Sequence, residues 1–305
     1  MKGRAQAPAK VQIGRFFRTI LPAAAILLIG ITVVLSILVY KVSYPGVVTE
    51  PVNPSHYLLP SLEVTIPSRD GTEIPGWWIP GLKNAPGIIL APGYGMGRSD
   101  ALSLASALHD KGFNILVYAQ RGSGSAPKTA STLGLCEAND MLGALRFLQR
   151  RPESNSARLG IWGVDVGALA ALKAAAIFTD IRAIAADSVF ESVADFLDYR
   201  IAEDFGLDNW FLQFGCHQIF RLVHIFSGCS MNEKLPLRAL SDRTILFIRG
   251  ENRKGLGTLT AAIYYKLRPQ KEMVSFKMAR VHAMSGEDLK SYDRQVASFF
   301  LLNLQ

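Results

Sequence analysis

A tight turn around Asp165 is the part of this sequence best suited to chemistry. The segment GIWGVDVGALAAL, residues 160–172, reads as a short apolar strand, a turn between Gly163 and Gly167, and a helix of small residues. Turns of the form G-x-nucleophile-x-G expose their central side chain, which is usually serine. Here it is an aspartate, which is ionised near neutral pH and needs no general base to attack carbon. The turn therefore predicts either a carboxylate nucleophile or a nucleophile turn that has lost its chemistry.

Strands and helices alternate along the chain on both sides of this turn. An opening β-hairpin is expected over residues 63–80. The alternation that follows predicts βαβ units, and therefore an α/β fold with a mostly parallel central sheet and helices on both faces. We expect strands at residues 87–91, 114–118, 159–162, 182–186, 243–249 and 273–277, and helices at about 100–111, 135–150, 166–178, 257–267 and 286–303.

Residues 190–240 break this alternation and are rich in aromatic side chains. We interpret them as two or three helices that form a cap over the C-terminal edge of the sheet, where open α/β folds bind ligands. A concave pocket under such a cap would suit an apolar small molecule. Two alternatives remain open: these helices pack as ordinary core, or some of their aromatic side chains touch a lipid bilayer.

The first 60 residues are expected to attach this domain to a membrane. Residues 19–40 form an uncharged run of 22 residues, which as a helix spans about 33 Å and can cross the hydrocarbon core. A cleaved signal peptide would have a shorter apolar run and a small-residue cleavage site, whereas this run ends in ILVYK. Five basic residues precede it, so residues 1–18 are expected in the cytoplasm and the domain, residues 61–305, on the periplasmic or outer side. Residues 41–60 are interpreted as a semi-extended tether.

Charge and composition argue against several other partners. Six basic residues flank the apolar run, and leaving them out reduces the 33 basic residues to 27, against 25 acidic ones. The domain is thus nearly neutral and carries no nucleic-acid motif, so nucleic-acid binding is not expected. No cofactor is predicted, because the glycine turns lack the Lys-Ser/Thr pair of a phosphate loop.

Cysteine and histidine residues of the cap give weaker signals. Cys216, His217, His224 and Cys229 are zinc-ligand types, but their spacing matches no metal motif, so no metal site is predicted. An exported domain meets oxidising conditions, which would permit a Cys216–Cys229 disulfide. Three unpaired thiols, with Cys136 as the third, are the open alternative.

Taken together, the motifs resemble the α/β-hydrolase fold superfamily, in particular membrane-anchored members similar to serine aminopeptidases and esterases. The likeness covers about residues 60–303 and consists of six segments in the expected order. The first three are similar to the oxyanion loop (APGYGMGRSD, 91–100), to D-x-R-G-x-G-x-S (YAQRGSGSA, 118–126) and to the helix that follows (TLGLCEANDMLGALRFL, 132–148). The other three are similar to the nucleophile turn (GVDVG, 163–167), to the usual source of the acid (ILFIRGENR, 245–253) and to the histidine loop with the last helix (ARVHAMSGEDLKSYDRQVASFF, 279–300).

Four positions depart from the family pattern. Asp165 replaces the nucleophilic serine, and Arg253 stands where the acid of the triad is usual. Pro92 replaces the histidine of the oxyanion loop, and Ala119 replaces the aspartate of D-x-R-G. Only His282 has the expected type at its expected place, so the resemblance implies a degenerate catalytic triad.

The resemblance leaves two functional hypotheses. In the first, the protein hydrolyses an ester, an epoxide or a haloalkane, with Asp165 as nucleophile, His282 as base, and the backbone N–H groups of Tyr94 and Val166 as oxyanion donors. Asp187, at the end of the sixth strand, is then the best candidate for the acid, although an Asp-Ser pair there is also a common turn cap. In the second, which we favour, the domain is catalytically impaired and binds an apolar ligand or a protein partner.

Overall fold

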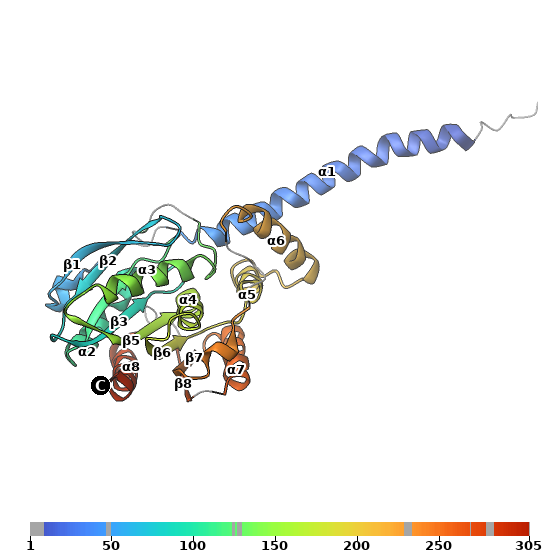
Figure 1. Ribbon diagram of the computed structural model, residues 1–305. Helices are drawn as coiled ribbons and strands as arrows, with labels where there is room; N and C mark the ends of the chain where they lie inside the picture. The colour runs from blue at the N-terminus through green and yellow to red at the C-terminus, as the bar shows by residue number, and fades with distance from the viewer. Residues whose placement is uncertain are drawn as a thin grey trace, which may run out of the picture.

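An eight-stranded sheet forms the centre of the protein in the computed structural model (Figure 1). The structure describes residues 9–46, 50–123, 126, 130–228, 234–268, 270–278 and 284–304, without the side chains of residues 9–17 and 19. The strand order is β1-β2-β4-β3-β5-β6-β7-β8, in which β2 is antiparallel to β1 and β4 and every other neighbouring pair is parallel. The predicted mostly parallel α/β sheet with its opening hairpin is therefore confirmed. The strands are β1 (Leu62–Pro67), β2 (Glu73–Ile79), β3 (Ala85–Ala91), β4 (Asn114–Tyr118), β5 (Ser154–Val164), β6 (Ile181–Asp187), β7 (Thr244–Gly250) and β8 (Lys271–Phe276).

Helices cover both faces of the sheet and divide the apolar interior into two cores. One core lies under α3 (Glu137–Gln149), α4 (Val166–Ala175) and α7 (Lys254–Lys266), and the other under α2 (Leu102–His109) and α8 (Gly286–Leu304). Every residue of α4 is buried. Its sequence VGALAALKAA explains why, since small side chains let the helix axis lie close to the sheet. Short 3₁₀ turns lie at Pro54–Tyr57, Arg98–Ala101 and Leu237–Leu240.

A single long helix, α1 (Ala9–Ser43), projects from the domain (Figure 1). Its segment Ile20–Ser43 has a mean hydropathy of 2.7 and is long and apolar enough to be a membrane span or a signal sequence. The last two turns do not project, because Leu35, Leu38, Val39 and Val42 are buried against the domain. The helix thus continues three residues beyond the predicted end of the apolar run and enters the domain.

The segment after α1 differs from the semi-extended tether that we expected. Glu50 forms a buried ion pair with Arg98, at 2.8 Å between Oε2 and Nη2, and also accepts a hydrogen bond from the Arg98 backbone N–H. Leu59 is buried. These contacts fix residues 50–60 on the surface of the domain, so the orientation of α1 is coupled to the fold.

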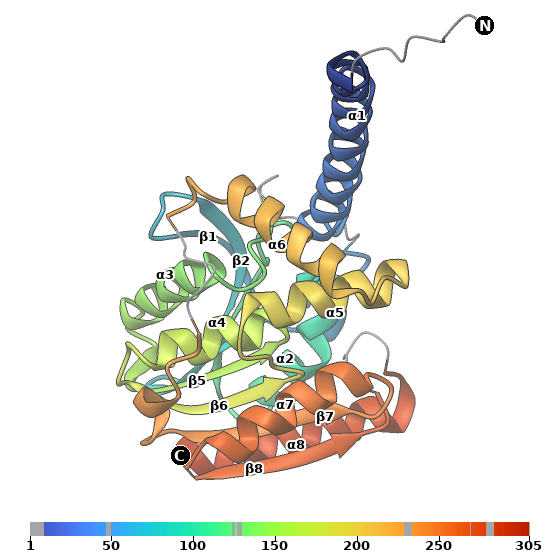
Figure 2. The same ribbon diagram turned by 90° about the vertical axis from the view of Figure 1, so that its right-hand side faces the viewer.

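Two helices separate the sheet from α1. They are α5 (Val193–Phe205), which begins with a capping box at Ser192 and ends at Gly206 in the left-handed conformation, and α6 (Trp210–Val223), which begins at the N-cap Asn209. Both views show α6 beside the C-terminal half of α1, with α5 beneath it (Figures 1 and 2). The region of the predicted cap is therefore helical, and it packs against the N-terminal helix.

Candidate active site

Asp165 lies in a strained turn between β5 and α4. Its backbone has φ 40° and ψ −102°, in a region that L-residues rarely adopt. Glycines permit this turn: a Cβ at Gly163 would lie 2.6 Å from the Ala168 nitrogen, and a Cβ at Gly167 would lie 2.4 Å from the Ala91 carbonyl oxygen. The backbone N–H of Asp165 donates to the Asp187 carbonyl at 2.8 Å. The local geometry is that of the nucleophile turn that the G-x-D-x-G pattern predicts.

The carboxylate of Asp165 is bound by the two backbone donors that we assigned to an oxyanion. Its Oδ1 accepts hydrogen bonds from the N–H of Tyr94 at 2.7 Å and from the N–H of Val166 at 2.5 Å. Asp165 is 1% exposed, and a Cβ at Gly93 would lie 2.8 Å from Oδ1. The positive end of the α4 dipole further favours an anion at this place. The two N–H groups that we predicted for a substrate oxyanion are thus bound to an oxygen of the protein itself.

This arrangement would hinder acyl transfer but leaves one oxygen of Asp165 for attack on an alkyl carbon. An acyl substrate would need the donors of Tyr94 and Val166 for its own developing oxyanion, and they are already used. The second oxygen, Oδ2, accepts no hydrogen bond from any residue within the described part of the chain. Attack by Oδ2 on an alkyl carbon would leave Oδ1 in the same hole as the carbonyl oxygen of the resulting ester. That route would still need a base to hydrolyse the ester.

Asp187, our candidate acid, ends β6 in a fully buried position. Its Oδ1 accepts a hydrogen bond from the Ser188 hydroxyl and its Oδ2 accepts one from the Tyr292 hydroxyl, each at 2.8 Å. Burial raises the pKa of Asp187 to about 8, and the nearby charge of Asp165 adds to this, although the two hydrogen bonds and Arg253 act in the opposite direction. At neutral pH the carboxyl group is therefore mostly protonated. A neutral carboxyl group does not stabilise an imidazolium ion as a triad acid does.

A chain of aromatic hydrogen bonds holds Asp187 in place. The indole N–H of Trp162, on β5, donates to the Tyr292 hydroxyl at 2.9 Å, and Tyr292, on α8, donates to Asp187. We did not assign a role to Trp162 or Tyr292 from the sequence. The sequence indicated only that each would need a hydrogen-bond partner if buried, as indole and phenol groups usually do.

The remaining triad positions do not supply another carboxylate at the usual place. Arg253 occupies the N-cap position of α7 without a capping side-chain hydrogen bond, and its positive charge acts on Asp187. Glu251, two residues before the usual acid position, is exposed. His282 lies outside the described residues. The structure therefore brings together Asp165, Tyr94 and Val166 directly, and connects Asp187 to them through the backbone.

The side chain of Tyr94 joins the oxyanion loop to α1 and α5. Its hydroxyl donates to the Val42 carbonyl at 2.8 Å, which satisfies a carbonyl at the end of α1 that has no partner within the helix. Its ring contacts Phe196 edge-on at 5.7 Å, and the Arg200 guanidinium lies 4.5 Å above it. Phe196 in turn stacks on Phe190 at 4.4 Å. An aromatic cluster and the end of α1 thus lie over the loop that binds Asp165.

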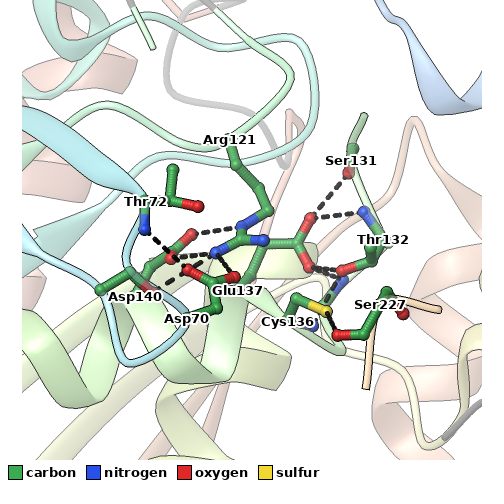
Figure 3. A network of polar contacts seen from close by, with 11 residues as sticks. Asp70, Thr72, Arg121, Ser131, Thr132, Cys136, Glu137, Asp140 and Ser227 are labelled. Atoms are coloured by element: carbon green, nitrogen blue, oxygen red, sulfur yellow. Dashed lines mark hydrogen bonds and ion pairs between the residues drawn. The ribbon is translucent and has the colours of Figure 1, made fainter. Parts of the chain in front are cut away.

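A buried polar network around Arg121 and Glu137 (Figure 3) includes Ser131, whose backbone also binds the end of α1. Arg121, from the predicted R-G-S-G loop, pairs with Asp140 and with Asp70. Glu137 is fully buried and accepts hydrogen bonds from Ser131, Thr132 and Gly134. The Ser131 N–H donates at 2.9 Å to the carbonyl of Ser43, the last residue of α1. The end of α1 is therefore bound by Ser131 of this network as well as by Tyr94 of the oxyanion loop.

The cysteine pairing differs from both sequence alternatives. Cys216 is a free buried thiol, so the Cys216–Cys229 disulfide is wrong. Cys136 is disulfide-bonded, so three unpaired thiols are wrong as well. Cys229 lies outside the described residues. Within the described part of the chain no group of three or more His, Cys, Asp or Glu side chains could hold a metal ion.

Comparisons with known proteins identify the fold. No family model matches the chain. It is 30% identical over 125 residues to the Mycobacterium tuberculosis protein Rv2307c, covering 40% of this chain and 44% of that protein, and 30% identical over 155 residues to Escherichia coli YfhR, covering 48% and 53%. The chain thus matches about half the length of these curated relatives.

Solved structures extend the likeness over most of the chain. The Pyrococcus furiosus esterase Pf2001 is similar with a TM-score of 0.66 and 21% identity, covering 87% of this chain and 99% of that one. The Anabaena variabilis dienelactone hydrolase is similar with a TM-score of 0.58 and 14% identity, covering 81% and 99%. Together with the sheet order and the strained turn at Asp165, these likenesses show that the chain has the α/β-hydrolase fold.

Proposed function

We propose that this protein is a membrane-anchored, hydrolase-like binding domain that does not hydrolyse esters or peptides. One observation carries the proposal: Oδ1 of Asp165 accepts hydrogen bonds from both Tyr94 N–H and Val166 N–H. In an acyl-transfer enzyme these donors would bind the oxyanion of the tetrahedral intermediate. Here a carboxylate oxygen would have to leave first, and its charge would repel the oxyanion that replaced it.

The surroundings of Asp187 support the same proposal. A hydrolytic step that uses histidine as base needs an ionised acid to orient that histidine. Asp187 is buried, hydrogen-bonded to Ser188 and Tyr292, and has its pKa raised to about 8 by burial. Arg253, at the usual acid position, carries the opposite charge.

The aromatic cluster over the oxyanion loop favours an apolar ligand or protein partner. Phe196 packs on Tyr94 and Phe190 stacks on Phe196, and both rings are fully buried. A site that opened between α5 and the oxyanion loop would be lined by these rings and would select apolar groups.

The anchoring part of the proposal rests on α1 and on Cys136. The segment Ile20–Ser43 meets the length and hydropathy of a membrane span, and basic residues on its N-terminal side favour a cytoplasmic N-terminus. The domain would then lie on the periplasmic or outer side. The disulfide at Cys136 fits that side, because disulfides persist in oxidising compartments.

The test compares the wild-type chain in detergent with Asp165→Ala and Asp165→Asn on a panel of esters, epoxides and haloalkanes. We expect no turnover by the wild type above that of either variant. Asp165→Asn is the matched control, because it keeps the size and the Oδ1 acceptor but has no nucleophilic carboxylate. Turnover by the wild type that both variants lose would overturn the proposal, and activity on epoxides or haloalkanes alone would identify the carboxylate-nucleophile route.

A second variant tests the role assigned to the filled oxyanion hole. Asp165→Ser removes the carboxylate and places a hydroxyl beside two freed N–H donors, so any fluorophosphonate labelling that this variant gains should be at the introduced serine. Neither the wild type nor Asp165→Ala should be labelled. Labelling of the wild type at another residue would place a nucleophile elsewhere in the fold and contradict the proposal.

A further inference from the structure

Helix α6 and the turn after it expose a set of large apolar side chains, which we call the α6 apolar face. Each member has between 55% and 96% of its surface exposed. Four members recur at helical spacing along one side of the helix, whereas Cys216 and Phe220 are buried on the opposite side. The face consists of Trp210, Phe211, Phe214, Leu222, Val223, Ile225 and Phe226.

This face lies next to the helix that is apolar enough to cross a membrane. Gly215, in the middle of α6, packs so closely on α1 that a Cβ there would lie 2.6 Å from Cδ1 of Leu35. Both ribbon views show α6 along the C-terminal half of α1 (Figures 1 and 2). Residues of α1 such as Ile29, Val33 and Ile37 are also exposed. The exposed apolar surfaces of α1 and α6 therefore belong to neighbouring helices.

The length of α1 fixes the depth at which α6 would meet a bilayer. Arg18 is the last charged residue before the apolar run. Leu35 follows 17 residues later, which is about 25 Å along a helix. The hydrocarbon core is about 30 Å thick, so a span that begins after Arg18 still has Leu35 inside its far boundary. The contact between Leu35 and Gly215 therefore puts α6 at the membrane–water interface.

The composition of α6 suits that interface. No acidic residue occurs between Asp208 and Glu233, so anionic headgroups would meet no like charge from this segment. Trp210 and Phe211 begin the helix, and large aromatic side chains are common at the level of lipid headgroups. An apolar face of this extent is unusual on a soluble surface and marks an interaction site.

We propose that the α6 apolar face lies in the outer leaflet of the same phospholipid bilayer that α1 crosses, so that the domain sits on the membrane rather than at the end of a tether. This inference rests on the proposed anchoring through α1. It goes beyond that proposal by assigning a second membrane contact, which fixes the orientation of the domain. The site at Asp165, under α5 and the end of α1, would then lie close to the lipid surface.

Tryptophan quenching tests the inference on the full chain. The chain has four tryptophans, of which Trp77, Trp78 and Trp162 are at most 4% exposed and Trp210 is 75% exposed. In vesicles of phosphatidylcholine with brominated acyl chains, we expect Trp210 to lose most of its emission. Trp210→Phe should remove the quenched component and leave the emission of the three buried tryptophans unchanged.

A matched control moves the reporter to the other side of the domain. Leu302 is 82% exposed near the end of α8. The C-terminal end of α8 lies far from α1 in both views (Figures 1 and 2). In the double variant Trp210→Phe, Leu302→Trp, the new tryptophan should show no quenching by brominated lipid. Leu222→Glu, which puts a charge into the α6 apolar face, should reduce the quenching of Trp210.

Failure of the anchoring and failure of the second membrane contact give different results. If alkaline carbonate extracts the chain from the vesicles, α1 does not span the bilayer, and both the anchoring and this inference are wrong. If the chain stays in the vesicles but Trp210 is not quenched, the anchoring stands and the second membrane contact is overturned. The second membrane contact is overturned as well if another copy of the chain shields Trp210 from water and brominated lipid does not quench it.

Discussion

Replacing Asp187 by asparagine should remove a steep pH dependence of stability. Burial raises the pKa of Asp187 from 3.8 to about 8 in the folded protein. The folded state therefore holds one more proton than the unfolded state between these two values, and its stability falls as the pH rises through that interval. The stabilising contribution of the proton is fully present below about pH 4 and is lost as the pH passes about 8. An asparagine side chain cannot ionise, so the Asp187→Asn variant should not show this loss.

The size of the expected loss of stability follows from the rise in the pKa of Asp187. Each pH unit in which the folded state holds one extra proton changes the free energy of unfolding by about 1.4 kcal/mol. Between pH 6 and pH 8 the wild type should lose about 2 kcal/mol more than Asp187→Asn. For a domain of this length that is a difference in Tm of roughly 4–8 °C. The measurement is thermal unfolding of the full chain in a nonionic detergent at both pH values.

Asp293→Asn is the matched control. Burial raises the pKa of Asp293 only to about 6, so its proton is lost at lower pH and it contributes little between pH 6 and pH 8. Asp165→Asn gives a second check, because the charge of Asp165 raises the pKa of Asp187. Removing that charge should move the loss of stability to lower pH. If the wild type and Asp187→Asn lose the same stability between pH 6 and pH 8, Asp187 is ionised throughout, and the argument against it as a triad acid fails.

Three further predictions concern the groups around the site. Asp165→Ala leaves two buried backbone N–H groups without their acceptor and should lower the free energy of unfolding by about 2 kcal/mol or more. Asp165→Asn should lower it less, and chemical denaturation of both variants measures the difference. Tyr94→Phe removes the hydrogen bond to the Val42 carbonyl and should cost about 1 kcal/mol, measured in the same way, and an unchanged stability would contradict a role in holding α1. Unfolding without reductant should let a thiol reagent modify Cys216 but not Cys136, and mass mapping of the labelled peptides would detect the opposite result.

The fold could be predicted because its signals are local. Buried parallel strands appear as short apolar runs such as GIILA, and the small residues of α4 indicate a helix packed against the sheet. The turn at Asp165 could be placed for the same reason, since Gly163 and Gly167 permit the close approach that it needs. These patterns depend on neighbours in the chain.

The contacts that define the site could not be predicted, because they join distant segments. Tyr292 is 105 residues from Asp187 and 130 residues from Trp162 in the sequence, and no neighbouring residue indicates either partner. The docking of α1 was missed for a related reason. Its last turns are as apolar as the rest of the helix, so the sequence does not distinguish the exposed residues of α1 from Val42, which is buried and whose carbonyl binds Tyr94.

The interaction that we propose prevents acyl transfer at Asp165 also stabilises the turn. An active enzyme of this fold holds its two oxyanion donors at a helix N-terminus without a protein acceptor until the transition state forms, and it keeps the nucleophile in a strained backbone conformation. Asp165 keeps the strain but gives both donors a permanent acceptor. Charge-assisted hydrogen bonds are stronger than neutral ones, so Asp165→Ser should lower the free energy of unfolding by about 1 kcal/mol or more while it opens the oxyanion hole. Stability and free oxyanion donors are then opposed at a single residue, and a Ser variant as stable as the wild type would show that the carboxylate adds nothing to the turn.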